Sequence, residues 1–285
     1  MSKRRALLYV PGDDLHKIQK AAGLNVDAII LDMEDGVALN RKDAAREIIA
    51  RVLKESNFGT SEKLVRVNPL EDSRGEKDIQ QILPSHPDGI VVPKVNSPEV
   101  LLQADRWLAE EEARQGWVEK SILLLAIIES AQAFLNLKDI CSCTDRLKGL
   151  IFGGEDLAAD IGATRTREAV ELLFARSSLV MHAAAYGLQA IDMVTVEFKD
   201  LDILKQDARA GAQMGYTGKQ VIHPAQVDAV QEAFTPSPAE LRAAQELVAA
   251  FEIHQKEGKG AFAFEGKMVD MPVIRRARNV IERGL

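Results

Sequence analysis

Eight short apolar runs, each followed by an amphipathic stretch, constrain the fold of this chain more than any other feature of its sequence. The runs are RRALLYV, DAIILDM, KLVRV, GIVVPKV, SILLLAII, LKGLIFGG, LQAIDMV and TGKQVI. Strict alternation of strands and helices implies parallel pairing with right-handed crossovers. Eight such repeats close most naturally into a (β/α)8 TIM barrel of about 250 residues. An open doubly wound sheet is the rival fold, but the GxGxxG motif of a dinucleotide site does not follow the first run.

The repeats stop near residue 234, so the sequence predicts a catalytic barrel over residues 1–234 and a C-terminal extension over residues 235–285. The extension opens with TPSPAELRAAQELVAAFEIHQ, whose Pro-marked, Ser-capped start and periodicity predict a helix. The Gly-rich segment GKGAFAFEGKMVDMP follows with short extended pieces, and a further helix is expected from Pro272 to Glu282. A piece this short does not make an independent domain, so we expect it to pack on the barrel mouth or on a neighbouring subunit.

The composition is that of a globular protein with an acidic balance. The chain has 285 residues, 46% of them hydrophobic, and a formal net charge of -7. This charge argues against nucleic acid or an anionic membrane as partner, and no apolar stretch reaches the roughly 20 residues that span a bilayer. Without a signal-peptide pattern, we expect a cytoplasmic protein, or a mitochondrial matrix protein in a processed form. Cys141 and Cys143 are too few for a disulfide framework or a zinc site.

Ionisable residues follow most of the apolar runs. Charged side chains are costly away from water unless they are paired or bind a metal, so converging ones more often build a site than support a core. Barrel enzymes place their active sites at the carboxyl ends of the strands, which is where these residues stand. They are Asp32, Glu34, Asp35, Arg66, Lys94, Glu129, Glu155, Asp156 and His223.

Glu129 and Asp156 end successive strands and should project from adjacent points of the barrel rim. Two carboxylates without thiolates or clustered imidazoles suit Mg2+ or Mn2+ better than zinc, with substrate oxygens and water completing an octahedron. The alternative is structural, with Glu129 as a carboxylate at a helix start and Asp156 as a helix N-cap. Both interpretations fit the spacing.

Arg66 has two roles open to it. Its permanently charged guanidinium suits an anion clamp or an enolate stabiliser, and it equally suits an ion pair with Asp32 or Glu34. The DMEDG segment that carries these two acids could bind a metal itself, but we favour a role in orienting Arg66.

Three other groups carry a functional and a structural interpretation each. Lys94 could form a Schiff base with a carbonyl substrate, although an ion-paired or surface lysine is more common. His223 could act as a base, although a lone histidine before proline more often has a structural role or marks backbone that binds a ligand. Tyr9, Lys17 and Lys20 lie in a basic stretch that suits a phosphorylated ligand, and solvated lysines are the simpler interpretation.

Ordered motifs run through nearly the whole chain: LYVPGDD, LDMEDGV, VRVN, PKV, IIES, FGGEDLAADIGA, GLQAID, GYTGKQVIHP and GKGAFAFEGKMVDMP. As a set they resemble the citrate lyase β-subunit-like acyl-CoA lyases of the HpcH/HpaI aldolase superfamily. The joint presence of FGGED, TGKQVIHP and the GKGAF to VDMP tail is most similar to the citramalyl-CoA lyase branch. The (β/α)8 barrel of that family agrees with the strand count, and its assemblies imply a homotrimer or hexamer.

The resemblance implies roles for particular residues. Glu129 and Asp156 would hold Mg2+, for which Mn2+ can substitute, and Arg66 would contact the reacting acyl oxygen. Asp270, in the VDMP motif, would act in the active site of an adjacent subunit. His16 stands where relatives can carry a basic side chain, which leaves the register of the phosphate contacts open. The groups implied to help hold coenzyme A are Tyr9, Lys17 or Lys20, and the backbone around Ile222 and His223.

The implied activity is Mg2+-dependent cleavage of (3S)-citramalyl-CoA to acetyl-CoA and pyruvate, with malyl-CoA as a second substrate. Mg2+ would chelate the substrate carboxylate and hydroxyl, and Arg66 would meet the enolate oxygen. In the condensation direction Asp270 would take a proton from the acetyl-CoA methyl group. The expected partners are thus an acyl-CoA and a ketoacid.

Three alternatives remain open at this point. A citrate lyase β subunit would act on citryl carried by a protein and would need companion subunits. A Schiff-base aldolase using Lys94 would work without metal and would be trapped by borohydride. A CoA-binding protein without activity would bind thioesters and leave them intact.

Overall fold

In the computed structural model the described residues are 3–197, 199–256 and 261–284. They form two compact units, the first ending at Gln231 and the second starting at Glu232. This division lies a few residues before the boundary predicted from the sequence. Within the described ranges, no helix combines the length and the apolar character needed to cross a membrane.

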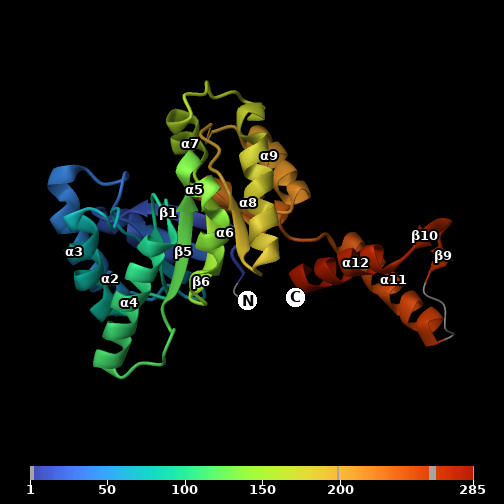
Figure 1. Cartoon of the computed structure of the whole chain (residues 1–285), viewed down its shortest axis with the longest axis horizontal. Helices are drawn as coiled ribbons and strands as arrows, with labels where there is room; N and C mark the ends of the chain where they lie inside the picture. The colour runs from blue at the N-terminus through green and yellow to red at the C-terminus, as the bar shows by residue number, and fades with distance from the viewer. Residues whose placement is uncertain (1–2, 198, 257–260, 285) are drawn as a thin grey trace. The chain divides into compact units, whose positions relative to one another are not determined.

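The first unit is built around eight parallel strands with helices outside them (Figure 1). The strands are β1 (Ala6–Pro11), β2 (Ala28–Asp32), β3 (Glu62–Arg66), β4 (Gly89–Val92), β5 (Leu123–Ile128), β6 (Leu147–Phe152), β7 (Gln189–Asp192) and β8 (Gly218–Val221). Each strand pairs with the next along the chain, and β8 pairs with β1. The barrel is therefore closed, and the predicted (β/α)8 fold is confirmed.

The helices of this unit follow the strands and begin and end at residues with clear local signals. The helix over residues 201–214 starts after the capping carboxylate of Asp200 and ends at Gly215, which has a φ of 103°. The helix over residues 73–82 starts at Ser73, where the Asp72 carboxylate caps it by accepting from Arg74 N–H. The helices are α1 (Leu15–Ala22), α2 (Lys42–Glu55), α3 (Ser73–Ile82), α4 (Pro98–Gln115), α5 (Ala131–Leu135), α6 (Leu137–Ser142), α7 (Gly154–Asp160), α8 (Leu173–Ala185), α9 (Leu201–Met214) and α10 (Val227–Ala233), with the short 3-10 turns η1 (Leu39–Arg41), η2 (Leu83–Ser85), η3 (Val170–Leu172) and η4 (Pro224–Gln226). The last two residues of α10 belong to the second unit.

Alternate residues of the strands point into the barrel and fill it with apolar side chains. Two positions further along four of these strands, the same alternation brings Tyr9, Asp32, Arg66 and Glu129 to the inward side. The ring of Tyr9 packs on the apolar layer below it. The barrel interior is thus a buried floor, and the polar side chains stand on it at the carboxyl ends of the strands. The floor consists of Leu7, Ala28, Ile30, Leu64, Val91, Leu125, Ile127, Ile151 and Ile191.

The second unit has two helices and a two-stranded antiparallel hairpin: α11 (Pro238–Lys256), β9 (Phe262–Phe264), β10 (Lys267–Val269) and α12 (Met271–Gly284). The Ser237 hydroxyl accepts from the backbone N–H of Glu240 at 3.2 Å and the Glu240 carboxylate accepts from Ser237 N–H at 2.8 Å, which forms a capping box. The predicted helices are present, and so are the extended pieces from residue 261 on; residues 258–260 of the Gly-rich segment lie outside the described residues. The predicted packing of this extension on a barrel mouth or on a neighbouring subunit stays a prediction. Its core contains Phe251, Phe262, Val269 and Ile274.

Candidate active site

A pocket of about 310 Å³ opens at the carboxyl end of the barrel. Its size suits a small acid together with the reactive end of a larger ligand. Inward-pointing residues from several strands contribute to it, as the strand alternation requires. The lining residues are Tyr9, Pro11, Asp32, Gly36, Arg66, Ile127, Glu129, Phe152, Gly153, Gly154, Glu155, Asp156, Val194, Gln220 and Ile222.

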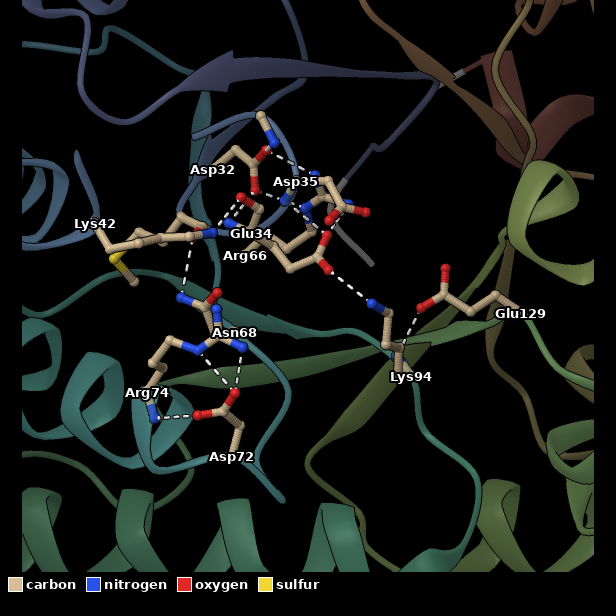
Figure 2. Close-up of polar contacts among 12 residues, drawn as sticks. Asp32, Glu34, Asp35, Lys42, Arg66, Asn68, Asp72, Arg74, Lys94 and Glu129 are labelled. Atoms are coloured by element: carbon tan, nitrogen blue, oxygen red, sulfur yellow. Dashed lines mark hydrogen bonds and ion pairs between the residues drawn. The ribbon is translucent and has the colours of Figure 1, made fainter. Parts of the chain in front are cut away.

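Arg66, the last residue of β3, is held by Asp32, the last residue of β2, and by Glu34 in the loop that follows (Figure 2). Its Nε and one terminal nitrogen each lie 2.7 Å from an oxygen of Asp32, and its other terminal nitrogen lies 3.0 Å from Glu34. Burial favours the neutral guanidine, but the hydrogen bonds and charge of Asp32 outweigh it and raise the pKa of Arg66. Arg66 is therefore a fixed cation that also lines the pocket, so the predicted ion pair and the predicted anion clamp are compatible.

The DMEDG segment, residues 32–36, is a loop held in place by hydrogen bonds from its own backbone and from Lys42. The Asp32 carboxylate accepts from the N–H groups of Glu34 and Gly36, each at 2.8 Å. A Cβ at Gly36 would lie 2.3 Å from the same carboxylate, so glycine is needed there. From α2, the Lys42 ammonium donates to the carbonyl oxygens of Met33 and Glu34 at 2.7 and 2.5 Å. These contacts agree with the prediction that the segment orients Arg66.

Lys94 links this loop to Glu129, which lines the pocket (Figure 2). Its ammonium lies 3.2 Å from Oε1 of Glu34, and its backbone N–H donates to Oε1 of Glu129 at 2.7 Å. Burial favours the neutral amine, but the ion pair with Glu34 outweighs it and raises the pKa of Lys94. Lys94 is not among the described residues that line the pocket. A protonated, ion-paired amine outside the lining is poorly suited to Schiff-base formation.

Glu129 and Asp156 both line the pocket and fit a divalent cation. Burial, followed by the charges of Asp156 and Glu34, raises the pKa of Glu129 to about 7, although the Lys94 N–H opposes the shift. A cation between the two acids would relieve both the desolvation and the repulsion. No group of three or more His, Cys, Asp or Glu side chains suited to a metal occurs in the part of the chain described. Two carboxylates leave coordination positions for substrate oxygens and water, as Mg2+ prefers.

The start of α7 makes room for these acids. Gly153 is the N-cap of α7, and a Cβ there would lie 2.4 Å from the Cβ of Glu129 and 2.7 Å from its Oε2. Asp156 lies in the first turn of the helix, so the alternative that made it the N-cap is wrong. Glu155 is paired with Arg165 at 3.0 Å, which leaves Asp156 as the better partner for Glu129.

The pocket does not bring together all of the residues that the sequence singled out. Tyr9, Arg66, Glu129, Asp156 and Ile222 line it. In the described lining, Lys17, Lys20 and His223 are absent; the two lysines are exposed on α1, and the ring nitrogen Nδ1 of His223 accepts from Ala225 N–H at 3.1 Å as a cap of η4. Asp270 is exposed in the second unit, where α12 begins.

Gln220 on β8 is a pocket residue that the sequence interpretation missed. Its side-chain amide donates to the carbonyl oxygens of Phe152 and Asp192 at 2.9 and 3.2 Å, which joins β8 to the ends of β6 and β7. The missed signal was the two-residue alternation along β8, which places Gln220 on the inward face while Lys219 and Val221 face outward.

A model of the HpcH/HpaI aldolase/citrate lyase family matches residues 5–224. This chain belongs to that family. Among relatives, the human citramalyl-CoA lyase, a mitochondrial protein, is 45% identical over 98% of this chain and 84% of its own length. The citrate lyase subunit beta of Haemophilus influenzae is 33% identical over 99% of this chain and 97% of its own length. These relatives cover both units, so the family likeness includes the extension.

A solved structure of this family also matches the whole chain. The CitE protein of Mycobacterium tuberculosis, in complex with magnesium, acetoacetate and coenzyme A, is 28% identical with a TM-score of 0.82, and the match covers 99% of this chain and 98% of that one. The family resemblance inferred from the motifs is therefore confirmed, and with it the fold.

Proposed function

We propose that the protein is an Mg2+-dependent carbon-carbon lyase that cleaves (3S)-citramalyl-CoA to acetyl-CoA and pyruvate. The observation that carries this proposal is the pocket, which gathers Glu129, Asp156 and Arg66 in a chain 45% identical to human citramalyl-CoA lyase. Magnesium, a ketoacid and coenzyme A in the CitE complex support the same ligand classes. Malyl-CoA is proposed as a second substrate, because a pocket discriminates one methyl group by only about 1–3 kcal/mol.

Different pocket residues would contact the two products, pyruvate and acetyl-CoA. Glu129 and Asp156 would hold Mg2+, which when bound supplies Lewis-acid stabilisation of charge on the ketoacid oxygens. During cleavage the hydroxyl proton passes to water and the carbinol C–O bond becomes the carbonyl of pyruvate. The bond between the carbinol carbon and the thioester α-carbon breaks, its electron pair passes to the acetyl-CoA enolate, and the enolate carbon then takes up a proton to give acetyl-CoA. Arg66 would stabilise the enolate oxygen, and because Asp32 and Glu34 already hold its guanidinium, little reorganisation is needed.

Asp270 is proposed as the group that exchanges a proton with the acetyl-CoA methyl carbon, from a neighbouring subunit. It lies beside the hairpin of the second unit, in the VDMP motif. Asp270 is exposed, so its carboxylate would be available to a ligand of another chain. This role requires the proposed homotrimer or hexamer.

The coenzyme A moiety is proposed to lie beside β1, α1 and the start of η4. The Tyr9 hydroxyl is buried without a hydrogen-bond partner among the described residues, and it lines the pocket. Burial raises its pKa, so it stays a donor. Lys17 and Lys20 are exposed on α1 and would meet phosphates, while the backbone at Ile222 and His223 would meet the adenine or pantetheine portions.

A coupled assay tests the proposed function directly. Purified protein is expected to release acetyl-CoA and pyruvate from citramalyl-CoA, to lose that activity in excess EDTA and to regain it with Mg2+. Malyl-CoA and citryl-CoA serve as comparison substrates. Activity that persists in EDTA would contradict the metal dependence, and the absence of turnover with all three thioesters would contradict a lyase that acts on free CoA thioesters.

Borohydride is expected to leave the protein unmodified in the presence of pyruvate, because the ion pair with Glu34 keeps the Lys94 amine protonated. Intact-mass spectrometry after reduction provides the measurement. A mass increase of one reduced pyruvate adduct on Lys94 would favour the Schiff-base aldolase over the metal-dependent lyase.

A citrate lyase β subunit is the second candidate, because the Haemophilus influenzae subunit is 33% identical over nearly the whole chain. Such a protein would be inactive on free CoA thioesters and active on citryl carried by a protein with its companion subunits. The predicted location is the cytoplasm, with the mitochondrial matrix as the alternative, and the mitochondrial human relative supports the alternative.

A further inference from the structure

Building on the proposed function, we propose that Lys94 is a positioning residue that sets the distance between the two halves of the active site. One half is the acidic site at Glu129, which receives the ketoacid, and the other is Arg66, which receives the thioester oxygen. Lys94 contacts Glu129 through its backbone and the acid that holds Arg66 through its side chain. Figure 2 shows it between Glu34 and Glu129.

The backbone contact depends on an uncommon conformation. Lys94 follows β4 with a φ of 53°, in the left-handed region that residues other than glycine, asparagine and aspartate seldom adopt. This conformation directs its N–H to Oε1 of Glu129 at 2.7 Å. Oε2 of Glu129 lies toward Gly153, where glycine leaves the space beside it open. The N–H of Lys94 thus fixes which carboxylate oxygen is engaged by the protein and which is left for a ligand.

The side-chain contact depends on charge. Lys94 and Arg66 bind opposite oxygens of one carboxylate, because the Lys94 ammonium lies 3.2 Å from Oε1 of Glu34 and Arg66 lies 3.0 Å from Oε2. Glu34 is only 4% exposed, so its position is set by these two cations and by the loop around it. A glycine at position 94 would tolerate the backbone better but would lose this contact. The presence of lysine at a left-handed position therefore indicates that both contacts are used.

Lys94 therefore connects Glu129 with the acid that holds Arg66, the groups that would contact the two parts of the substrate. In the proposed reaction the bond that breaks joins the ketoacid part to the thioester part, so the carboxylate site and Arg66 must keep a fixed separation. Small displacements of groups that orient a reaction cost large rate factors. The Lys94 side chain is 44% exposed, so its ion pair contributes little to global stability, and its effect should appear in turnover.

Lys120 offers a matched control far from the pocket. It also has a positive φ, 59°, donates its N–H to a buried carboxylate, Glu112, at 2.9 Å, and pairs its ammonium with Asp145 at 3.4 Å. Its side chain is likewise 44% exposed. Replacing either lysine with methionine removes the ammonium and keeps the backbone N–H. The two variants therefore differ in whether the lost ion pair belongs to the active site, as that of Lys94 does, or lies outside it, as that of Lys120 does.

The experiment compares Lys94→Met, Lys94→Arg, Lys94→Gly and Lys120→Met with the wild-type protein in the citramalyl-CoA assay, with calorimetric Mg2+ titration and thermal unfolding alongside. We expect Lys94→Met and Lys94→Gly to lose about 10- to 100-fold in kcat, with KM, Mg2+ affinity and thermal midpoint close to wild type. Lys94→Arg should recover most of the loss, because it restores a cation beside Glu34. Lys120→Met should behave as wild type.

Three results would overturn the proposal. One is wild-type kcat in Lys94→Met and Lys94→Gly while the wild-type protein is active. Another is a parallel loss of Mg2+ affinity in Lys94→Met, which would place its action at the metal site alone. The third is a failure of Lys94→Arg to recover activity, as expected if the amine were a nucleophile. A wild-type protein inactive on every thioester would overturn the proposed function itself.

Discussion

Replacement of Asp270 by asparagine is expected to lower kcat by about 10²–10⁴-fold, the usual contribution of a general acid-base group. Asparagine keeps the size of the side chain and its acceptor oxygen, so the contact of Oδ1 with Val273 N–H at 3.4 Å and the start of α12 should survive. The amide cannot take a proton from the acetyl-CoA methyl group. Steady-state kinetics provide the measurement, with Mg2+ and coenzyme A affinities expected to match the wild type.

Asp200→Asn is the matched control, because Asp200 also stands at a helix start, that of α9, and lies outside the described pocket lining. It should leave kcat unchanged. Mixing Asp270→Asn chains with Glu129→Gln chains before reassembly tests the origin of the base. Recovery of activity in the mixture is expected if Asp270 serves a neighbouring subunit, and wild-type turnover by Asp270→Asn alone would remove it from the mechanism.

Replacement of Arg66 by methionine is expected to reduce both stability and turnover. Asp32 and Glu34 are 2% and 4% exposed, and without Arg66 two buried carboxylates would lose their main counter-charge. Breaking a buried ion pair costs about 3–5 kcal/mol, and the loss should fall near the lower end because Lys94 still pairs with Glu34. The kcat should fall by about 10²–10³-fold with the loss of the group that stabilises the enolate oxygen. Urea unfolding and steady-state kinetics measure the two effects.

Two further variants separate these effects. Arg66→Lys restores a charge but not the paired contacts with Asp32, so it should recover part of the stability while kcat stays low. Arg146→Met removes a buried arginine bound to Glu112 and Asp105 outside the described pocket lining, and it should lower stability without lowering kcat of the folded protein. Wild-type kcat in Arg66→Lys would contradict the role of the guanidinium geometry.

The barrel could be predicted because its signals are local. The apolar runs and the helix ends at Asp200 and Gly215 are short-range features, and strand order follows from strict alternation. The strand ends also located Glu129, Asp156 and Arg66, because the carboxyl ends of parallel strands meet on one face.

Other features of the site depend on contacts between residues that are distant in the sequence. The left-handed backbone of Lys94 and its link to Glu129 join residues separated by 35 positions, which no local pattern reveals. Gln220 required the two-residue alternation of β8 to be combined with its neighbours on the barrel. The place of Asp270 in the reaction depends on a second copy of the chain, so it remains a prediction.

The alternation of inward-facing positions has a consequence for how this family diversifies. Tyr9, Asp32, Arg66 and Glu129 each stand two positions after an apolar residue of the barrel interior, and each comes from the end of a different strand. A mutation at one of these pocket positions therefore changes a ligand contact without reshaping the hydrophobic layer of the barrel interior. New acyl preferences can accumulate through single replacements of pocket residues outside the ion pairs of Arg66 with Asp32 and Glu34, because the hydrophobic layer stays intact.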